Sequence, residues 1–453
     1  MNPVKIIVVG GNSAGPAAAA KAKRVDPAAV VNLFETEQFI STGTCEMPYV
    51  LSGEIKDFED VIFYNPESFL SKKGVQVFVR HRVEEIDRKA KTITVTDLQN
   101  DKLIEYKYDT LILCTGSYVK MLPGFSNDLK NVFKLKSIGD LIHLENYLKK
   151  NLVTKATIIG SGYIGLEASE ALHKQNISIT IIEKEALPLP SAEDEISKRI
   201  LTELEKHNVN FVGGCKTIEP LIKEDKVVSV KVDEDYIDSD LVLMATGIAP
   251  NNLLAQQAKL EIGNFGGIKV DKKLRTSDRY IFAAGDNIEF TNALTAKPDY
   301  FPFSIYSHSF GHIAGENAAG GNANAEPIVK NVSVKIFNYF FTSVGLDSTG
   351  AEQSRFKAVT VTAETPNLVT VMPESKNGFG KLIFDIESKR ILGACFLGGK
   401  EVSGYADLIS SAIYSEQKID FLTKITFNYT PPLSPFINLL SVLGRKAVAK
   451  SKR

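Results

Sequence analysis

The chain has 453 residues, and its 53 Lys and Arg against 54 Asp and Glu give a formal net charge of −1. At ~100 to 200 residues per domain, this length predicts about three domains. The interspersed charge argues against a nucleic-acid partner held by bulk electrostatics, and no apolar run approaches the ~18 residues of a membrane span. Four widely spread cysteines fit neither a disulfide scaffold nor a metal site, which favours a reducing, cytoplasmic compartment.

The chain opens with a strand, a glycine-rich turn, a helix and a second strand that ends in an acid. Strand 6–9 runs into the turn Gly10–Gly15, an alanine-rich helix follows, and strand 30–34 ends at Glu35. Such a turn lets the backbone approach a pyrophosphate, and the helix offers unpaired N–H groups and the positive end of its dipole. Glu35 is placed to accept hydrogen bonds from ribose hydroxyls. The unit predicts a dinucleotide site, although Asn12 replaces the usual second glycine.

Cys45 lies just beyond this unit, and no second cysteine occurs within five residues on either side. That placement indicates one redox thiol facing a flavin. The next residue, Glu46, would oppose thiolate formation if its carboxylate points inward. Cys114 and Cys395 lie in apolar strands and are expected to be inert, buried side chains, whereas Cys215 carries no interpretation.

A second copy of the same pattern follows about 150 residues later. Strand 156–159 leads into a turn with glycines at 160, 162 and 165, a helix runs through Leu172, and strand 178–182 ends at Glu183. The Glu183 carboxylate would accept a hydrogen bond from a ribose 2′-hydroxyl and repel a 2′-phosphate. The second copy therefore predicts a nicotinamide dinucleotide site that favours NADH over NADPH.

Each copy is followed by a strand that ends in Thr-Gly, at residues 111–116 and 241–247. A further apolar segment, 280–286, ends in Gly285-Asp286 and has no counterpart in the second copy. We interpret it as a return to the first domain after the second has been inserted.

The pattern changes at about Pro327 to β-rich segments such as 332–337 and 381–385, with one amphipathic helix near 405–416. This part has no glycine turn of the phosphate-binding kind, so packing or dimerisation is its expected role. The five basic residues from Arg445 to Arg453 are expected to form a solvated tail.

These motifs together resemble the two-dinucleotide-binding-domain flavoprotein disulfide reductases, and within them the single-cysteine branch of coenzyme A disulfide reductases and NADH oxidases or peroxidases. The resemblance covers nearly the whole chain. It implies an α/β fold with two Rossmann-like domains, for FAD and NAD(P)H, and a C-terminal α+β domain that builds a homodimer. The implied boundaries are 1–118 with 258–324 for FAD, 119–257 for NAD(P)H, and 325–453 for the interface domain.

The resemblance also implies roles for single residues. Cys45 is the redox cysteine, Asp286 holds the FAD ribityl chain, and Tyr163 covers the flavin until nicotinamide displaces it. The positions implied for FAD are Gly10, Gly11, Ser13, Ala14, Gly15, Glu35, Val83, Thr115, Gly116 and Asp286. Those implied for NAD(P)H are Gly160, Gly162, Tyr163, Ile164, Gly165, Glu183 and Gly247.

The coenzyme A branch is indicated by a C-terminal tyrosine and by basic residues on the first helix. Tyr429 precedes Thr430-Pro431-Pro432 and resembles a tyrosine that reaches the partner subunit's active site, where it can protonate a leaving thiolate. Lys21, Arg24 and Ser41 are the expected contacts of coenzyme A. Two departures weaken the match, because Val371-Met372 stands where paired tyrosines are common, and Leu433 and Ile437 replace tyrosine and lysine.

Three functions remain open. The oxidases and peroxidases resemble one another in having a histidine in the first glycine turn, where this chain has Ser13. The dithiol reductases need a C-terminal histidine as an acid-base, and in this chain no histidine follows His312. The first hypothesis is NAD(P)H-dependent reduction of a small disulfide, such as coenzyme A disulfide, a persulfide or a polysulfide, through Cys45. The second is an NADH oxidase that uses a Cys45 sulfenic acid. The third is a flavin-binding redox sensor with low turnover; none of the three requires a metal.

Overall fold

The apolar strand at the start of the chain lies at the centre of a parallel sheet in the structure, a computed structural model that describes residues 3–452. In spatial order the strands are β20 (Ile281–Ala283), β9 (Thr110–Leu113), β1 (Lys5–Val9), β2 (Val30–Phe34) and β5 (Gln76–Phe78). Strand β1 pairs in parallel with both β2 and β9, and Ile6 to Val9 are buried, as expected for a parallel strand covered on both faces.

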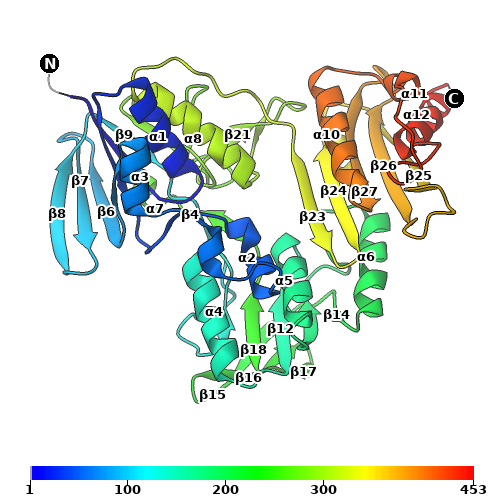
Figure 1. The fold of residues 1–453 in the computed structure, drawn as a ribbon, viewed down its shortest axis with the longest axis horizontal. Coiled ribbons are helices and arrows are strands. Elements are labelled where there is room, and N and C mark those ends of the chain that lie inside the picture. The colour runs from blue at the N-terminus through cyan, green and yellow to red at the C-terminus, as the bar shows by residue number, and fades with distance from the viewer. Residues whose placement is uncertain (1–2, 453) are drawn as a thin grey trace.

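The last strand to join this sheet comes from the far side of the second domain. Residues 281–283 of β20 pair with β9 in parallel, so the chain returns to the first unit after an insertion. Helices α1 (Ala14–Val25) and α8 (Ser304–Ala318) lie together against the sheet (Figure 1). The meander of β6 (His81–Asp87), β7 (Thr92–Asp97) and β8 (Lys102–Lys107) contributes to the same core.

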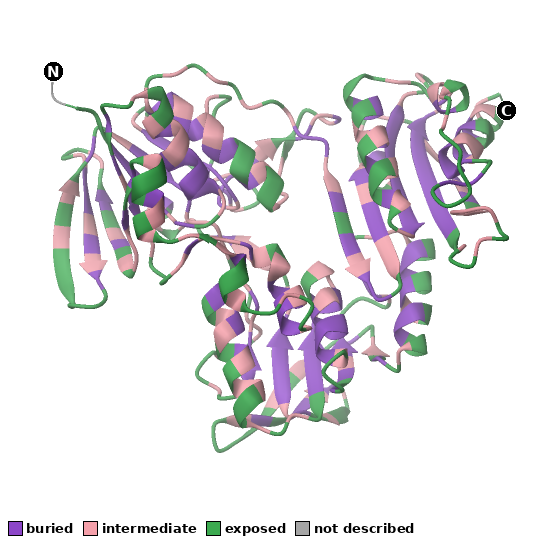
Figure 2. Cartoon of the chain, in the orientation of Figure 1, coloured by how far each residue is buried: buried purple, intermediate pink, exposed green. Residues whose placement is uncertain are grey.

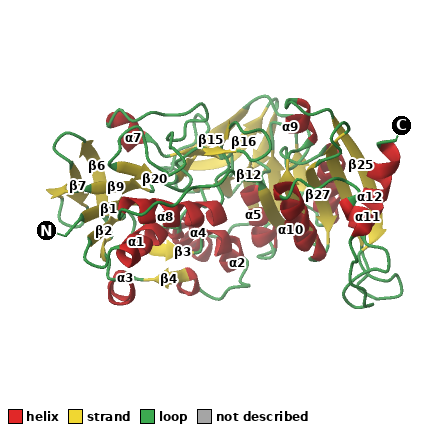
Figure 3. Cartoon of the chain, turned by 90° about the horizontal axis from the view of Figure 1, so that it is seen from above, coloured by secondary structure: helices red, strands yellow, loops and turns green. Residues whose placement is uncertain are grey.

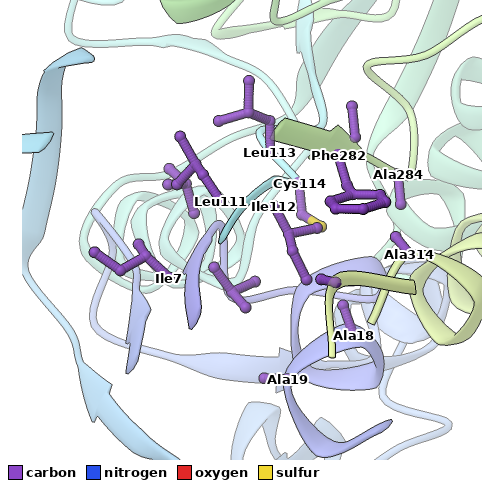
Figure 4. Packing of buried hydrophobic residues seen from close by; sticks show 14 of the residues in the cluster. Ile7, Ala18, Ala19, Leu111, Ile112, Leu113, Cys114, Phe282, Ala284 and Ala314 are labelled. Carbon is purple, nitrogen blue, oxygen red and sulfur yellow. The ribbon is translucent and has the colours of Figure 1, made fainter. Parts of the chain in front are cut away.

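Helices α1 and α8 touch at their backbones. A Cβ atom on Gly311 would lie 2.3 Å from the Ala14 carbonyl oxygen, and one on Gly315 would lie 2.1 Å from that of Ala18. These distances leave no room for a side chain, so glycine is required at both positions. Beside this contact, the side chains of Cys114, Phe282 and Ala314 close the core (Figure 4).

The second unit repeats the parallel architecture. Its strands, in spatial order, are β11 (Val132–Phe133), β18 (Leu241–Met244), β12 (Lys155–Ile159), β13 (Ser178–Ile182) and β14 (Asn210–Val212). The remaining elements are helices α4 (Ile138–Lys150), α5 (Tyr163–His173) and α6 (Asp194–Lys206), and the meander β15 (Ile218–Lys223), β16 (Lys226–Val232) and β17 (Asp235–Asp238).

Two chain crossings connect the first and second units. They pair with each other in antiparallel fashion as β10 (Ser117–Val119) and β19 (Ile248–Pro250). Helix α7 (Leu253–Gln257) follows, and its Ala255 is buried in the core of the first unit. The chain thus re-enters the first core at α7, a few residues before residue 258, which is the boundary that the resemblance implies for the return to the first unit.

The third unit is an antiparallel sheet with helices on it. The strands, in spatial order, are β23 (Asn331–Ile336), β24 (Tyr339–Gly345), β27 (Ile391–Gly398), β26 (Asn377–Asp385) and β25 (Ala358–Pro366). The helices are α9 (Ser348–Glu352), α10 (Glu401–Tyr414), α11 (Phe421–Lys424) and α12 (Leu439–Lys450). Figure 2 shows that buried residues concentrate on the strands of all three units.

The predicted C-terminal tail is a helix as far as Lys450, although its basic residues from Arg445 to Lys452 are exposed, as expected; Arg453 lies outside the described residues. Leu440, Leu443 and Ala447 form a buried stripe on α12, so this segment packs as a helix. Two of the basic side chains bind β25, since Lys446 Nζ donates to the Thr362 carbonyl at 2.8 Å and Lys450 Nζ to that of Thr360 at 3.0 Å.

Helix α10 begins earlier than predicted, at Glu401. In the described part of the chain, no helix is long and apolar enough to cross a bilayer.

Replacing Gly315 by Ala should destabilise the fold through the α1–α8 contact. The added methyl group would be forced against the Ala18 carbonyl, and overpacking of this kind costs about 1–3 kcal/mol. The matched control is Gly404→Ala on α10, where a Cβ would meet nothing within 4 Å and the helix should gain stability. Thermal unfolding midpoints of the two variants test this, and equal midpoints would contradict the proposed importance of the contact.

Candidate active site

The first glycine turn is closed by backbone contacts that only glycine permits. Gly10 has φ +108°, and a Cβ there would lie 2.0 Å from the Cys114 carbonyl oxygen. A Cβ on Gly15 would lie 1.7 Å from the Gly10 carbonyl oxygen. Helix α1 begins at Ala14, and the side chain of Ser13 does not cap it. Its first N–H groups therefore remain available to an anion.

The acid after the second strand binds the turn in both copies. Glu35 Oε2 accepts a hydrogen bond from Gly11 N at 2.5 Å, and burial raises the pKa of this carboxyl. In the second copy Glu183 Oε2 accepts from both the backbone N and the Oγ of Ser161, at 2.9 and 2.8 Å. Each copy of the sequence repeat thus contains the same hydrogen bond, in which a backbone N–H of the glycine turn donates to the acid after the second strand. This bond fixes each carboxylate at the edge where a ribose would lie.

Asp286 lies at the edge of the first sheet, where three segments meet. Its carboxylate accepts from Ser117 Oγ at 2.9 Å and Ser307 Oγ at 2.8 Å, and Lys136 Nζ lies 3.2 Å away. The next residue, Asn287, is fully buried, and its Oδ1 has no hydrogen-bond partner among residues 3–452. An uncapped helix, two fixed carboxylates and an unpaired buried acceptor fit a long polar cofactor such as FAD along this edge.

The other positions expected at the cofactors lie in the core of the first unit or directly after strands of the two parallel sheets. Val83 is buried on β6, and Thr115 Oγ1 donates to the Asn251 carbonyl at 2.5 Å. Gly116 and Gly247, after the two Thr-Gly strands, have φ of +67° and +89°. Both follow strands at the carboxyl edges of the parallel sheets, the usual location of ligands in such folds.

The second glycine turn has the same geometry as the first. Gly160 has φ +103°, and a Cβ on Gly165 would lie 2.1 Å from its carbonyl oxygen. Gly162 lies directly before α5, and a Cβ there would meet nothing within 4 Å. The following residue, Tyr163, lies 5.9 Å from the Phe303 ring, at the start of α8, while Ile164 is exposed. Tyr163 therefore lies between the second glycine turn and the start of α8.

Cys45 is the exposed member of the four cysteines. It lies in the 3₁₀ turn Thr44–Glu46, which leads into helix α2 (Met47–Leu51). The Cys45 Sγ atom is 3.6 Å from Oγ of Ser304, the first residue of α8, and Ser13 Oγ donates to the Ser304 carbonyl at 3.2 Å. The thiol, the first glycine turn and the start of α8 thus meet at one point.

Several groups act on the Cys45 thiol. Although the residue is exposed, the protein around it partly desolvates the sulfur and raises the pKa of the thiol above its ordinary value, and the hydrogen bond with Ser304 opposes that rise. The carboxylates of Glu46 and Glu167 raise the pKa further, whereas the charge of Lys136 lowers it. The effect that the sequence predicts for Glu46 is therefore present, and Ser304 and Lys136 counter it.

Glu167, Ser304 and Lys136 are site residues that the sequence did not reveal. Glu167 lies on α5, and burial together with the charge of Glu170 raises its pKa to about 7, while a hydrogen bond from Tyr49 lowers it. An acid one turn after a glycine turn, at the start of an apolar helix, is a signal that could have identified Glu167. No sequence pattern places Ser304 beside Cys45, because 259 residues separate them.

The expected coenzyme A contacts lie around α1. Lys21 forms an ion pair with Glu316 of α8 at 2.8 Å, and Arg24 is exposed. Ser41 has φ +50°, and its backbone N donates to the Gly11 carbonyl at 2.7 Å, so it borders the first glycine turn.

Tyr429 is not brought to Cys45 within one chain. It lies in the loop between α11 and α12, at the C-terminal end of the molecule (Figure 3). The Tyr429 side chain is 49% exposed and packs at right angles against Phe436, which is 79% exposed. Leu433 in the same loop is 72% exposed. The role implied for Tyr429 therefore requires a second subunit.

Replacing Glu167 by Gln should make the Cys45 thiol more reactive, but only above about pH 7. Because the pKa of Glu167 is raised to about 7, this carboxyl is largely neutral below that pH and negative above it. Removing the charge lowers the pKa of Cys45, which should speed alkylation of the reduced protein at pH ~8.5 by roughly two- to fivefold. Rates of reaction with iodoacetamide test this against Glu54→Gln, an exposed control, and an equal gain at pH ~6 would contradict it.

Comparisons with known proteins agree with this geometry. The family model described as pyridine nucleotide-disulphide oxidoreductase matches residues 4–299, and that of the family's dimerisation domain matches 332–439. The chain is 29% identical over 448 residues to an NADH oxidase of Methanocaldococcus jannaschii, covering 99% of both chains. It is 30% identical over 446 residues to the CoA-dependent NAD(P)H sulfur oxidoreductase of Pyrococcus abyssi, covering 97% of both.

Among solved structures, a NAD-dependent persulfide reductase from A. fulgidus superposes with a TM-score of 0.94 at 30% identity. The match covers 99% of this chain and 84% of that one. The predicted fold class and the resemblance stated from the motifs are confirmed. The chain belongs to the pyridine nucleotide-disulphide oxidoreductase family.

Proposed function

We propose that this enzyme uses NADH to reduce a small disulfide or persulfide, of which coenzyme A disulfide is the best candidate, through the single thiol of Cys45. The observation that carries the proposal is the setting of Cys45. It is exposed, it lies 3.6 Å from the Ser304 hydroxyl at the meeting point of the first glycine turn and α8, and the three other cysteines are buried. One accessible thiol suits exchange with a small-molecule disulfide.

Two cofactors belong to this function. The family is FAD-dependent and uses NADH or NADPH. The first glycine turn, Glu35 and Asp286 would hold FAD, which when bound relays two electrons from the nicotinamide to the thiol. The second turn and Glu183 would hold the nicotinamide dinucleotide. Because the Glu183 carboxylate is fixed by Ser161, it would repel a 2′-phosphate, which favours NADH.

The chain's own residues govern the exchange step. The Cys45 thiolate attacks one sulfur of the disulfide, the S–S bond breaks, and one thiolate leaves as a mixed disulfide forms on Cys45. The two electrons of NADH then reduce the mixed disulfide and release the second thiol. Ser304 donates a hydrogen bond to the thiolate, and Lys136 favours its charge. Overall one disulfide, one NADH and one proton give two thiols and NAD⁺.

A homodimer would complete the site. The third unit matches the dimerisation domain of the family, and its loop 425–438 exposes Tyr429, Leu433 and Phe436. A partner would cover these apolar side chains. Its Tyr429 hydroxyl would then be available to protonate the thiolate that leaves the disulfide.

An NADH oxidase is the second candidate, because a relative that matches over almost its full length carries that name. In that function Cys45 would cycle through a sulfenic acid formed with oxygen. Ser13 stands in the glycine turn where a histidine would act on that species, and its hydroxyl is engaged by the Ser304 carbonyl. This favours the disulfide reaction over the oxygen reaction.

Replacing Cys45 by Ser should lower disulfide turnover by about a thousandfold or more, because the thiol is the nucleophile. Cys215→Ser is the matched control, since that sulfur is buried and donates to the Val212 carbonyl at 3.3 Å. The measurement is anaerobic NADH consumption with coenzyme A disulfide, cystine or polysulfide, compared with oxygen alone. Full activity of the Cys45 variant, or wild-type turnover no faster than with oxygen, would contradict the proposal.

A further inference from the structure

The loop that follows the second acid, residues 184–192, lies against the second glycine turn. The backbone N of Leu189 in this loop donates to the Ser161 carbonyl at 3.0 Å, and Ser191 Oγ donates to the Tyr163 hydroxyl at 3.3 Å. Ser161 belongs to the glycine turn, and Tyr163 is the first residue of α5. The 184–192 loop therefore borders the place where a nicotinamide dinucleotide would lie on the turn.

The backbone of this loop has an unfavourable conformation at its centre. Leu189 has φ +53° and is fully buried, and its carbonyl accepts from Ala192 N at 2.8 Å. A left-handed conformation at a residue other than glycine is uncommon, and it persists where the surrounding structure imposes it. Contacts outside the loop must therefore help to hold it in place.

A buried lysine of the third unit binds the residue at the end of this loop. Lys381 lies on β26 and is the only buried Lys or Arg among residues 3–452. Its Nζ donates to Oε2 of Glu193, the residue before α6, at 2.7 Å, and to Oε2 of Glu195 at 3.1 Å. The other carboxylate oxygen of Glu193 accepts from the backbone N of Ser348 at 2.7 Å. The third unit thus binds both oxygens of Glu193.

This ion pair lies beside an apolar contact between the second and third units. Ile196 of α6 belongs to the same core cluster as Phe379 and Cys395 of the third sheet, and Figure 1 shows α6 next to that sheet. Burial by itself would lower the pKa of Lys381, but its hydrogen bonds to the two carboxylates raise it, so the lysine is charged. Because desolvation offsets the attraction in a buried ion pair, such a pair adds little stability, although its geometry is strict.

We propose that Lys381 is a positioning residue for the nicotinamide dinucleotide, because by binding Glu193 it holds the 184–192 loop against the second glycine turn. The path runs from Lys381 to Glu193 and the loop, and from the loop to Ser161 and Tyr163. The inference goes beyond the proposed function and rests on one part of it, the placement of the dinucleotide at the second turn. Affinity for a ligand of the second unit thus depends on a side chain of the third.

The test is calorimetric titration of the flavin-bound protein with ADP-ribose, which lacks the nicotinamide and cannot exchange electrons. Lys381→Met removes the charge and keeps most of the side chain, so the loop should leave its bound position more often. The dissociation constant of ADP-ribose should rise about three- to tenfold. In stopped-flow reduction of the flavin, the half-saturating NADH concentration should rise by the same factor, while the limiting rate should stay within about twofold.

Glu193→Gln is the second variant, and it should act in the same direction. The double variant should bind ADP-ribose no more weakly than Lys381→Met alone, because both changes remove one interaction. Thermal unfolding and flavin content show whether each protein is folded. Unchanged affinity in folded Lys381→Met or Glu193→Gln, or additive losses in the double variant, would overturn the inference.

Arg199→Met is the matched control for a contact between the same two units. Arg199 of α6 binds Glu364 of β25 at 2.8 Å, but these side chains are 41% and 40% exposed, and neither belongs to the loop. An exposed pair of this kind contributes little, so ADP-ribose affinity should not change. A loss as large as that of Lys381→Met would contradict a specific role for Lys381.

Gly162→Val tests the placement of the dinucleotide separately. A Cβ at Gly162 meets nothing within 4 Å, so the variant should fold, while its side chain would occupy space that a pyrophosphate needs. Unchanged ADP-ribose affinity in Gly162→Val would contradict the placement at the second turn. Loss of affinity there, with Lys381→Met unaffected, would contradict only the role of Lys381, so the two failures are distinguishable.

Discussion

The backbone contact between α1 and α8 is the constraint on which the rest of the structure depends. Gly311 and Gly315 allow α8 to lie directly on Ala14 and Ala18, although α8 comes almost 300 residues later in the chain. The contact joins the two halves of the interrupted first unit. It also places the start of α8 beside Cys45, so the environment of the thiol depends on glycines about two and three turns farther along α8.

Much of the fold could be predicted because its signals are local. The glycine turns, the strand endings and the two acids lie within one βαβ unit each, and the structure shows the same carboxylate-to-backbone hydrogen bond at Glu35 and Glu183. Helix α12 was missed because its basic residues suggested a solvated tail. The apolar stripe on that helix stabilises it only when the folded sheet of the third unit is there to pack against it. Strand β25 of that sheet also accepts the hydrogen bonds from Lys446 and Lys450.

The candidate site was predictable only in part. Cys45 could be identified because its single-thiol context is local. Ser304, Lys136 and Glu167 act on it from three other segments, and only the folded chain brings their charges and hydrogen bonds to the sulfur. Tyr429 illustrates the opposite case, since its motif is visible in the sequence, while one chain leaves it exposed and far from the thiol.

The central claim is that one thiol carries the exchange, and the intact mass of the protein after anaerobic incubation with coenzyme A disulfide tests it most directly. The account predicts one coenzyme A adduct, which peptide mapping places on Cys45 and which disappears when NADH is added. An adduct on Cys114, Cys215 or Cys395, no adduct at all, or an adduct that NADH does not remove would contradict it.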